Sequence, residues 1–298
     1  MVEKTKLCND GSLDNEDYRK IQIYATTIPA MLGEAFCELR GRQMSDKERL
    51  SVTFLGSLTG LFDDLFDRKA LLPDEIKRLL NKPEKSNAAN NSELLLIELY
   101  QIGLANSDKP DLIKEYALKV YEAQLQSKRQ SSTELSKEDI QQITFEKGGV
   151  SIPLYRCAFE ENISQAEYDM LYRLGAIGQL ENDIFDVYKD YSEGIQTLVT
   201  TETDISKLRE KYQLLITDIF QLIDKTQYLV PRKRRFKRVV ALVVGRGLVV
   251  LDNLQNLSRK TEGVFLLEKY SRKELICDME SPLNLLKLLH YAAIYTKK

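Results

Sequence analysis

The sequence has 298 residues, of which 43% are hydrophobic and 30% are charged, as is usual for globular proteins. The net charge of −2 excludes a field over the whole molecule that would draw it to nucleic acid or to a membrane. With one histidine and no tryptophan, a His-rich metal site or a catalytic triad is not expected, so any metal ion must be held by oxygen ligands.

The cysteines and the apolar stretches bear on the compartment. Four cysteines lie far apart in the sequence and form no CxxC pair. The first ten residues contain no apolar run of the kind found in a secretory signal, and the most apolar stretch, 239–251, is too short to span a bilayer. We therefore expect reduced thiols and a cytoplasmic location.

Seven prolines and 14 glycines favour long helices over a sandwich or a barrel. Residues 1–14 are expected to be flexible, and residues 15–298 to form a single all-α domain. Apolar periodicity, capping signals and helix breakers predict helices over 15–39, 46–67, 93–104, 111–127, 137–159, 164–191, 206–228, 232–258 and 281–295.

Two local signals inside these helices are specific. Ser45 and Glu48 have the spacing of a capping box at the start of the second helix. Gly148, Gly149 and Pro153 predict a kink or a break inside the helix over 137–159.

The first acidic cluster closes the helix predicted over 46–67. Asp63 and Asp67 are four residues apart, and Asp64 precedes Asp67 by three, so all three carboxylates project toward one side of a helix. Like charges at this spacing repel each other, and the macrodipole disfavours them further at the C-terminal end of a helix. A divalent cation reverses both effects, which indicates a functional site.

The second acidic cluster lies near the end of the helix predicted over 164–191. Asn182, Asp186 and Asp190 recur every four residues and form one stripe of oxygen ligands, with Asp183 one position aside as a supporting residue. A solvated acidic face is the alternative for either cluster alone. Two such stripes, each following apolar helix, favour two facing sites for Mg²⁺, which prefers oxygen ligands.

At these residues the sequence resembles the class I isoprenoid synthase superfamily. Asp63-Asp64-Leu65-Phe66-Asp67 matches its DDxxD motif, and the segment from Asn182 to Asp190 is similar to the NDxxSxxxE motif of terpene cyclases. Asp186 stands where Ser or Thr is usual and Asp190 where Glu is usual, and both keep an oxygen ligand. Between Ser45 and Thr200 the order of motifs looks closest to the bacterial large-terpene synthases, the tetraprenyl-β-curcumene synthase-like group called class IB.

The resemblance implies a single-domain helical bundle with a central apolar cavity and a prenyl diphosphate as the substrate. It implies that the oxygen ligands of both clusters bind a small set of Mg²⁺ ions: Asp63, Asp64, Asp67, Asn182, Asp186 and Asp190. Such ions neutralise the leaving diphosphate, and a dry cavity protects the allylic cation from water. The expected activity is that of a Mg²⁺-dependent class I terpene synthase, a carbon–oxygen lyase that makes a cyclic or linear terpene.

Two alternatives stay open. The run from Asp186 to Asp190, followed by Gly194, is also similar to the DVxxDxxxG motif of squalene and phytoene synthases, which implies a head-to-head or other prenyltransferase. Only Arg68 follows the first cluster closely, where chain-elongating synthases have an Arg-Arg pair, so chain elongation is disfavoured. A non-catalytic helical scaffold is the second alternative.

Three basic residues are candidates for binding the diphosphate: Lys147, Arg156 and Arg246. Lys147 precedes the glycines predicted to break a helix, where free backbone groups would also meet an anion. Arg156 follows within three helical turns and is a candidate diphosphate sensor. Arg246 belongs to a polar stripe with Asp252 and Asn256 in an otherwise apolar helix.

The strongest basic run is 232–238, with the sequence RKRRFKR. It is either a solvated helix start, a surface that gathers diphosphate, or a contact with anionic lipid. No nucleic-acid-binding motif accompanies it, so nucleic acid is not an expected partner. Peripheral membrane contact and a homodimer stay open, as do the chain length of the substrate and the identity of the product.

Overall fold

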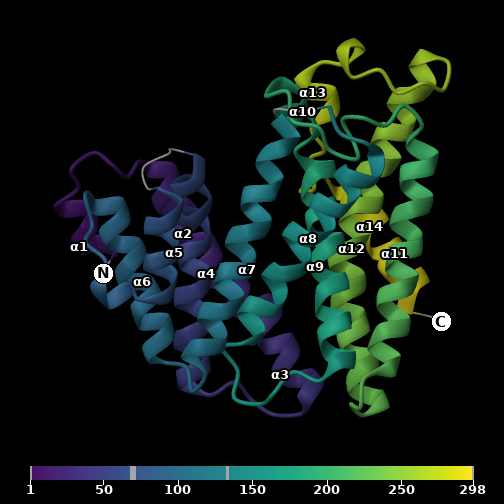
Figure 1. Ribbon diagram of the computed structural model, residues 1–298. Coiled ribbons are helices and arrows are strands. Elements are labelled where there is room, and N and C mark those ends of the chain that lie inside the picture. Colours follow the sequence, from purple (N-terminus) through teal and green to yellow (C-terminus); the bar gives the residue numbers. More distant parts are fainter. Residues whose placement is uncertain (1, 68–71, 132–133, 297–298) are drawn as a thin grey trace. The chain divides into compact units, whose positions relative to one another are not determined.

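A computed structural model describes residues 2–67, 72–131 and 134–296, with side chains for 5–62, 72–131 and 134–296. These residues form helices and loops and no strand, which confirms the all-α prediction (Figure 1). The elements are α1 (Val2–Leu7), α2 (Asn15–Thr27), η1 (Ile28–Gly33), α3 (Glu34–Arg40), α4 (Asp46–Asp67), α5 (Pro73–Asn81), η2 (Pro83–Lys85), α6 (Asn91–Ala105), α7 (Pro110–Ser127), η3 (Lys128–Ser131), α8 (Lys137–Arg156), α9 (Gln165–Phe185), α10 (Val187–Ser192), α11 (Ile205–Lys225), α12 (Val230–Ser258), η4 (Arg259–Thr261), η5 (Leu267–Lys269), α13 (Arg272–Leu275) and α14 (Pro282–Thr296).

The helices group into two compact units. Unit 1 comprises residues 1–119 and 154–163, and unit 2 comprises residues 120–153 and 164–298. In unit 1, α4 packs against both α2 and α6, and its Val52 and Leu55 are buried. In unit 2, α9, α11 and α12 pack against one another, and α14 packs against α12 (Figure 1).

The segment before α2 contacts α6, and the flexibility expected over 1–14 stays a prediction. It contains α1 and a loop that is hydrogen-bonded to the first turn of α6, where the Asn91 backbone N–H donates to Asp10 over 3.0 Å. The Asn91 side chain donates to the carbonyl of Cys8 over 2.6 Å, and Leu13 is buried. Free N–H groups at the start of α6 account for this docking, because they need acceptors from elsewhere in the chain.

The helix predicted over 15–39 is divided into three parts. Between α2 and α3 the backbone widens into the π-helical segment η1, where the Glu34 N–H donates to the carbonyl of Pro29. Proline has no N–H to donate within a helix and its ring displaces the preceding turn, so a local π turn is a common adjustment. Helical structure continues through the segment, as the apolar pattern predicts.

The capping box predicted at Ser45 and Glu48 is confirmed. The Ser45 N–H donates to the Glu48 carboxylate over 2.9 Å, and the Glu48 N–H donates to the Ser45 hydroxyl over 3.3 Å. Two further donors reach the same buried carboxylate: the Arg42 guanidinium at 2.6 Å and the Glu160 backbone N–H at 2.9 Å. Burial alone raises the pKa of Glu48, but these hydrogen bonds outweigh it and lower the pKa to about 2.

This carboxylate makes the stability of the protein depend on pH. Because the pKa of Glu48 is lower in the folded than in the unfolded chain, its contribution is fully present above about pH 4.5 and is lost as the pH falls toward 2. We expect Glu48→Gln to lower the free energy of unfolding at pH 7 by about 2 kcal/mol and to flatten its pH dependence in this window. Urea denaturation between pH 3 and 7 measures both effects.

Glu34 provides the matched control for Glu48. Its carboxylate pairs with Arg49 at 2.6 Å, but both side chains are about half exposed. Exposed pairs of this kind contribute little to stability, so Glu34→Gln is expected to change the free energy of unfolding by less than about 1 kcal/mol. Equal losses in the two variants would contradict the importance assigned to the buried carboxylate.

Helix α8 is continuous from Lys137 to Arg156, so the break predicted as one possibility at Gly148, Gly149 and Pro153 is wrong, whereas a kink there stays a prediction. The glycines instead permit a close helix crossing. A Cβ atom added to Gly148 would lie 2.1 Å from the carbonyl oxygen of Gly175 in α9, and one added to Gly149 would collide with the ring of Tyr172. The absence of side chains here lets the two backbones touch.

Helix α12 and the turn after it are the only part of the described chain long and apolar enough, by length and composition, to cross a membrane. More than half of its apolar window is buried inside the protein. The core helix of a globular domain can be equally long and apolar, because it is apolar on every side that meets a neighbouring helix.

Candidate functional site

The first acidic cluster closes α4. The helix extends to Asp67, and the residues that lead into the cluster, Leu61 and Phe62, are buried in unit 1. The side chains of Asp63, Asp64 and Asp67 lie outside the described residues, so their approach to the second cluster stays a prediction.

The second cluster is built on the crossing of α8 and α9 in unit 2. The contact of Gly148 with Gly175 brings α8 close to α9, so residues a helical turn away from the glycines also meet. Thr144, one turn before Gly148, donates a hydrogen bond to the carboxylate of Asp183 over 3.2 Å. Gln179, on α9 itself, donates to the other carboxylate oxygen over 2.9 Å. Asp183 is thereby held in place, and its role in supporting metal ligands stays a prediction.

The stripe of oxygen ligands spans a helix boundary. The sequence predicts one helix to position 191, but α9 ends at Phe185 and α10 starts at Val187, with Asp186 between them at φ −90° and ψ 11°. The spacing of four survives, because the Asp186 N–H still donates to the carbonyl of Asn182 over 2.8 Å and the Asp190 N–H to that of Asp186 over 2.9 Å. The Asn182 amide donates to the Asp186 carboxylate over 3.3 Å. The structure therefore brings Asn182, Asp186 and Asp190 together along one helical path.

The carboxylates of this cluster repel one another. Asp190 is half-buried, and burial followed by the negative charges of Asp183 and Asp186 raises its pKa to about 7. Burial likewise raises the pKa of Asp183 to about 6 against the opposing effects of its hydrogen bonds and of Lys147. The ionised forms of Asp183 and Asp190 are thus disfavoured relative to those of exposed aspartates, and a cation bound beside them would favour these forms.

Lys147 is the one basic candidate from the sequence that acts on these acids from α8. Its ammonium group lowers the pKa of both Asp183 and Asp190, so it lies close enough to act on both carboxylates. Lys147 is half-buried and directly precedes the glycine crossing. The crossing thus positions a cation beside the acids, where it can bind an anionic ligand shared with them.

Arg246 reaches the same part of α9 from α12. Its Nε atom lies 3.3 Å from a carboxylate oxygen of Glu181, and its guanidinium lies 5.1 Å from the centre of the Phe185 ring. The arginine side chain is 43% exposed, whereas that of Glu181 is 7% exposed. Burial raises the pKa of Glu181 to about 7 against the effect of Arg246. The guanidinium of Arg246 therefore stays accessible beside α9, the helix that contains Asn182.

Arg156 belongs to unit 1, whereas the acid cluster belongs to unit 2. Its side chain is fully buried and packs on the ring of Phe159. The guanidinium donates to the carbonyl oxygens of Glu161 over 3.1 Å and Asn162 over 3.5 Å in the loop that follows α8. Anchoring this loop accounts for Arg156, and we leave it out of the proposed site.

The donor set suits Mg²⁺ as one half of a site. Within the part of the chain that the structure describes, no group of three or more His, Cys, Asp or Glu side chains converges closely enough to hold a metal ion alone. Mg²⁺ is usually held by one or two carboxylates together with phosphate oxygens and water, so a preformed cage is not required. The oxygens of Asn182, Asp186 and Asp190 fit that requirement, and the repulsion between Asp186 and Asp190 favours a cation there.

Three residues of this region were not identified from the sequence as functional: Thr144, Gln179 and Glu181. Thr144 lies one turn before the glycines on α8, and Gln179 lies one turn before Asp183 on α9. Only the pairing of Gln179 with Asp183, four residues apart on one helix, can be seen in a helical pattern. The pairing of Thr144 with Asp183 depends on how closely α8 and α9 cross.

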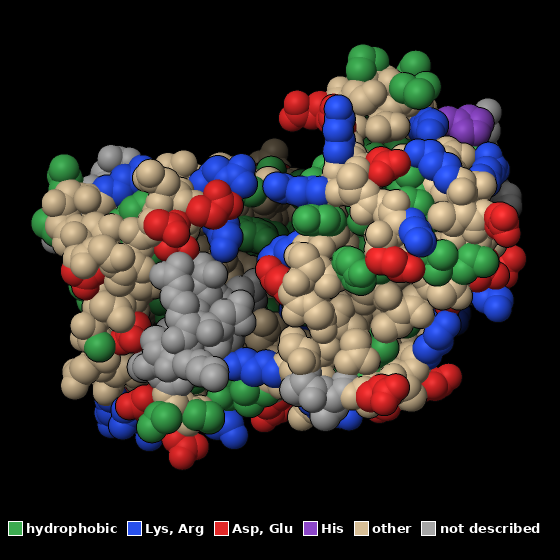
Figure 2. Space-filling model, turned by 90° about the horizontal axis from the view of Figure 1, so that it is seen from above, with side chains coloured by type: hydrophobic (Ala, Val, Ile, Leu, Met, Phe, Trp, Pro, Cys, Tyr) green, Lys and Arg blue, Asp and Glu red, His purple; other side chains and the backbone are tan. Residues whose placement is uncertain are grey.

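Comparison of the chain with protein-family models, with curated proteins and with solved structures finds no match. The face shown in Figure 2 adds no indication about this acid cluster. On the face shown in Figure 2, Lys and Arg side chains are interspersed with Asp and Glu side chains, in keeping with the net charge of −2.

Proposed function

We propose that this protein is a Mg²⁺-dependent class I terpene synthase that ionises a prenyl diphosphate. The observation that carries the proposal is the acid cluster at the junction of α9 and α10. There the repulsion of Asp183 and Asp186 adds to burial and raises the pKa of Asp190 to about 7. The resemblance of both acidic motifs to those of the superfamily supports the same activity.

In this proposal Asn182, Asp186 and Asp190 hold Mg²⁺ from one side, and Asp63, Asp64 and Asp67 hold it from the other. Bound Mg²⁺ supplies the Lewis acid that neutralises a leaving diphosphate. Each residue contributes an oxygen ligand, in keeping with the preference of this ion.

Two basic side chains bind the diphosphate directly. Lys147 acts on the carboxylates of Asp183 and Asp190, so an anion bridging to that cluster also meets its ammonium group. Arg246 has an exposed guanidinium beside α9 and makes bidentate binding of a phosphate group feasible. Thr144 and Gln179 keep Asp183 in one orientation, and the substrate thus meets a cluster whose geometry is already fixed.

A prenyltransferase of the squalene and phytoene synthase type is the second candidate. The resemblance to the DVxxDxxxG motif supports it, and its glycine has a structural role here: Gly194 follows α10 with a left-handed φ of 71°, and the next residue, Ile195, donates its N–H to the carbonyl of Asp190 over 2.8 Å. The glycine that follows the two aspartates in the DVxxDxxxG pattern is thus required by the backbone itself. The two candidates differ in whether one or two prenyl groups enter the product.

The test is to incubate the purified protein with Mg²⁺ and one prenyl diphosphate at a time, from geranyl diphosphate upward in chain length. We expect release of pyrophosphate that stops when the metal is chelated, and a hydrocarbon or alcohol with the carbon number of the single substrate. A product containing two prenyl groups would identify the prenyltransferase. Absence of pyrophosphate release with every substrate would contradict both candidates and favour the non-catalytic scaffold.

A further inference from the structure

The last helix of unit 2 leaves one face uncovered. α14 packs against α12 through residues such as Leu288, which lies next to Gly245, and Ala292, which is buried. On its other side Leu283, Leu286 and Leu289 are 63%, 65% and 57% exposed. Their spacing of three residues places them along one stripe of the helix. A contiguous row of exposed leucines is unusual on a protein surface and marks a place where another apolar medium or partner is bound.

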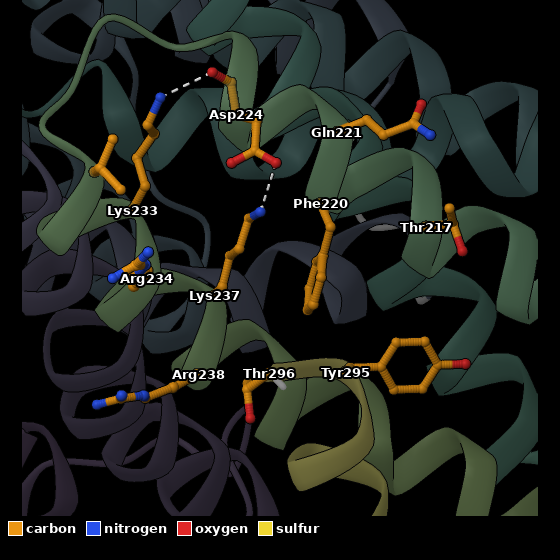
Figure 3. A pocket seen from close by; sticks show the side chains of 11 residues that line it. Thr217, Phe220, Gln221, Asp224, Lys233, Arg234, Lys237, Arg238, Tyr295 and Thr296 are labelled. Carbon is orange, nitrogen blue, oxygen red and sulfur yellow. Dashed lines mark hydrogen bonds and ion pairs between the residues drawn. The ribbon is translucent and has the colours of Figure 1, made fainter. Parts of the chain in front are cut away.

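One edge of this stripe runs into a basic groove. Leu289 follows Leu285 by four residues, and Thr296 follows Leu289 by seven. At this spacing the three residues lie on one flank of α14. Thr296 and Tyr295 line a groove of about 660 Å³ together with side chains from the end of α11 and the start of α12 (Figure 3). The flank of α14 that carries Leu285 and Leu289 therefore leads to the groove at Thr296.

The groove is rich in cations. Lys233 donates to the backbone carbonyl of Asp224 over 2.8 Å, and Lys237 pairs with the carboxylate of Asp224 at 2.6 Å (Figure 3). Arg234 and Arg238 follow each other at the helical spacing of four, also line the groove, and are exposed. The next residue on that row of α12 is Leu242, which is 43% exposed. On α12, the two exposed arginines are thus followed along the same row by an exposed leucine. On α14, the flank that reaches the groove also carries exposed leucines.

Helices α12 and α14 contribute few acidic side chains to this surface, although the exposed Asp278 and Glu280 lie just before α14. α14 contains no Asp or Glu, and α12 contains none before Asp252. The only acid that lines the groove is Asp224, whose charge is already paired with Lys237. We call this region the α12–α14 surface, and define it by Arg234, Arg238, Leu283, Leu285, Leu286 and Leu289.

We propose that the α12–α14 surface docks on the face of a lipid bilayer that contains anionic phospholipid. The leucine stripe enters the boundary between headgroups and acyl chains, while Arg234 and Arg238 bind lipid phosphates at the groove. Amphipathic helices that lie in an interface combine these two elements, with basic residues beside an apolar face. Charge decides between this occupant and a symmetric dimer through the same surface, because the dimer would set the arginines against the same arginine-rich surface, whereas a lipid bilayer sets phosphates against them. The docking does not depend on the proposed chemistry.

The test uses the full chain and sedimentation with vesicles of phosphatidylcholine, with or without phosphatidylglycerol. We expect binding to the anionic vesicles, weakened by added salt, and little binding to neutral ones. Each basic side chain near an anionic surface strengthens binding about fivefold, so the charge reversal Arg234→Glu with Arg238→Glu is expected to weaken it at least about 25-fold. Leu286→Ser is expected to weaken it about tenfold.

Two control variants remove the same residue types elsewhere. Leu214 on α11 is 70% exposed, so Leu214→Ser matches Leu286→Ser in exposure. Lys77 and Arg78 on α5 are exposed, so Lys77→Glu with Arg78→Glu matches the arginine pair in charge. Circular dichroism melting curves verify that all variants fold.

Three results would overturn the proposal. They are an absence of binding to anionic vesicles, equal losses in the control and test variants, and a dimer in light scattering that Leu286→Ser dissociates. The last would assign the leucine face to a second copy of the chain.

Discussion

Replacement of Asn182 or Asp186 by alanine is expected to lower Mg²⁺-dependent release of pyrophosphate at least about 100-fold while the protein stays folded. Both residues offer oxygen ligands at the junction of α9 and α10, and Asn182 is exposed while Asp186 is half-buried, so neither substitution removes core packing. Removal of either oxygen ligand is expected to weaken the binding of Mg²⁺, the ion that would neutralise the leaving diphosphate. Steady-state assays with the best prenyl diphosphate, together with thermal melting, measure activity and folding separately.

Asp169 supplies the matched control on the same helix. It is exposed in the second turn of α9 and accepts a hydrogen bond from Gln165 over 2.7 Å. Asp169→Ala should leave turnover within about twofold of the wild type, since it removes a carboxylate far along the helix from the cluster. Asp63→Ala extends the test to the first motif, with the same expected loss as Asn182→Ala. Full turnover in Asn182→Ala or Asp63→Ala would remove the basis of the proposed function.

The second large effect concerns the helix crossing that supports the site. Gly175→Ala is expected to lower the free energy of unfolding by about 3 kcal/mol, since the added Cβ would lie 2.1 Å from the carbonyl oxygen of Gly148. The obstacle is backbone rather than a flexible side chain, so the helices must separate. Separation of α8 from α9 would also weaken the hydrogen bond from Thr144 to Asp183. Urea denaturation measures the loss of stability.

Gly178 is the control for this crossing, because it lies one turn along the same helix and a Cβ added to it meets no atom within 4 Å. Gly178→Ala is expected to raise the free energy of unfolding by about 0.5 to 1 kcal/mol, as alanine restricts the unfolded chain and favours helix. If Gly175→Ala were as stable as Gly178→Ala, α8 and α9 would not touch at this point.

Much of the helical architecture could be predicted from local signals. The start of α4 follows from the reciprocal capping of Ser45 and Glu48, and the structure reproduces those hydrogen bonds. The helix predicted over 232–258 corresponds to α12, which runs from Val230 to Ser258. Such features depend on side chains within one or two turns of each other, so the sequence contains all the information needed to find them.

The errors share a physical cause. Gly148 and Gly149 indicate a break when a helix is considered alone, because glycine lowers helix propensity. In the fold, the same glycines remove the steric barrier to a close crossing, and packing against α9 stabilises the helix that local propensity would interrupt. The break appears instead at Asp186, where no glycine or proline is present.

By itself, the sequence determined which residues bear side-chain oxygens, how they are spaced along each helix and where most helices lie, because these properties depend on neighbours within a few residues. Only the tertiary structure decided that Thr144 and Lys147 act on the acids of α9, that Arg246 reaches Glu181, and that Arg156 is buried in a loop anchor. Those contacts join different helices or a helix and its following loop. Their geometry follows from packing, which a helical periodicity does not specify.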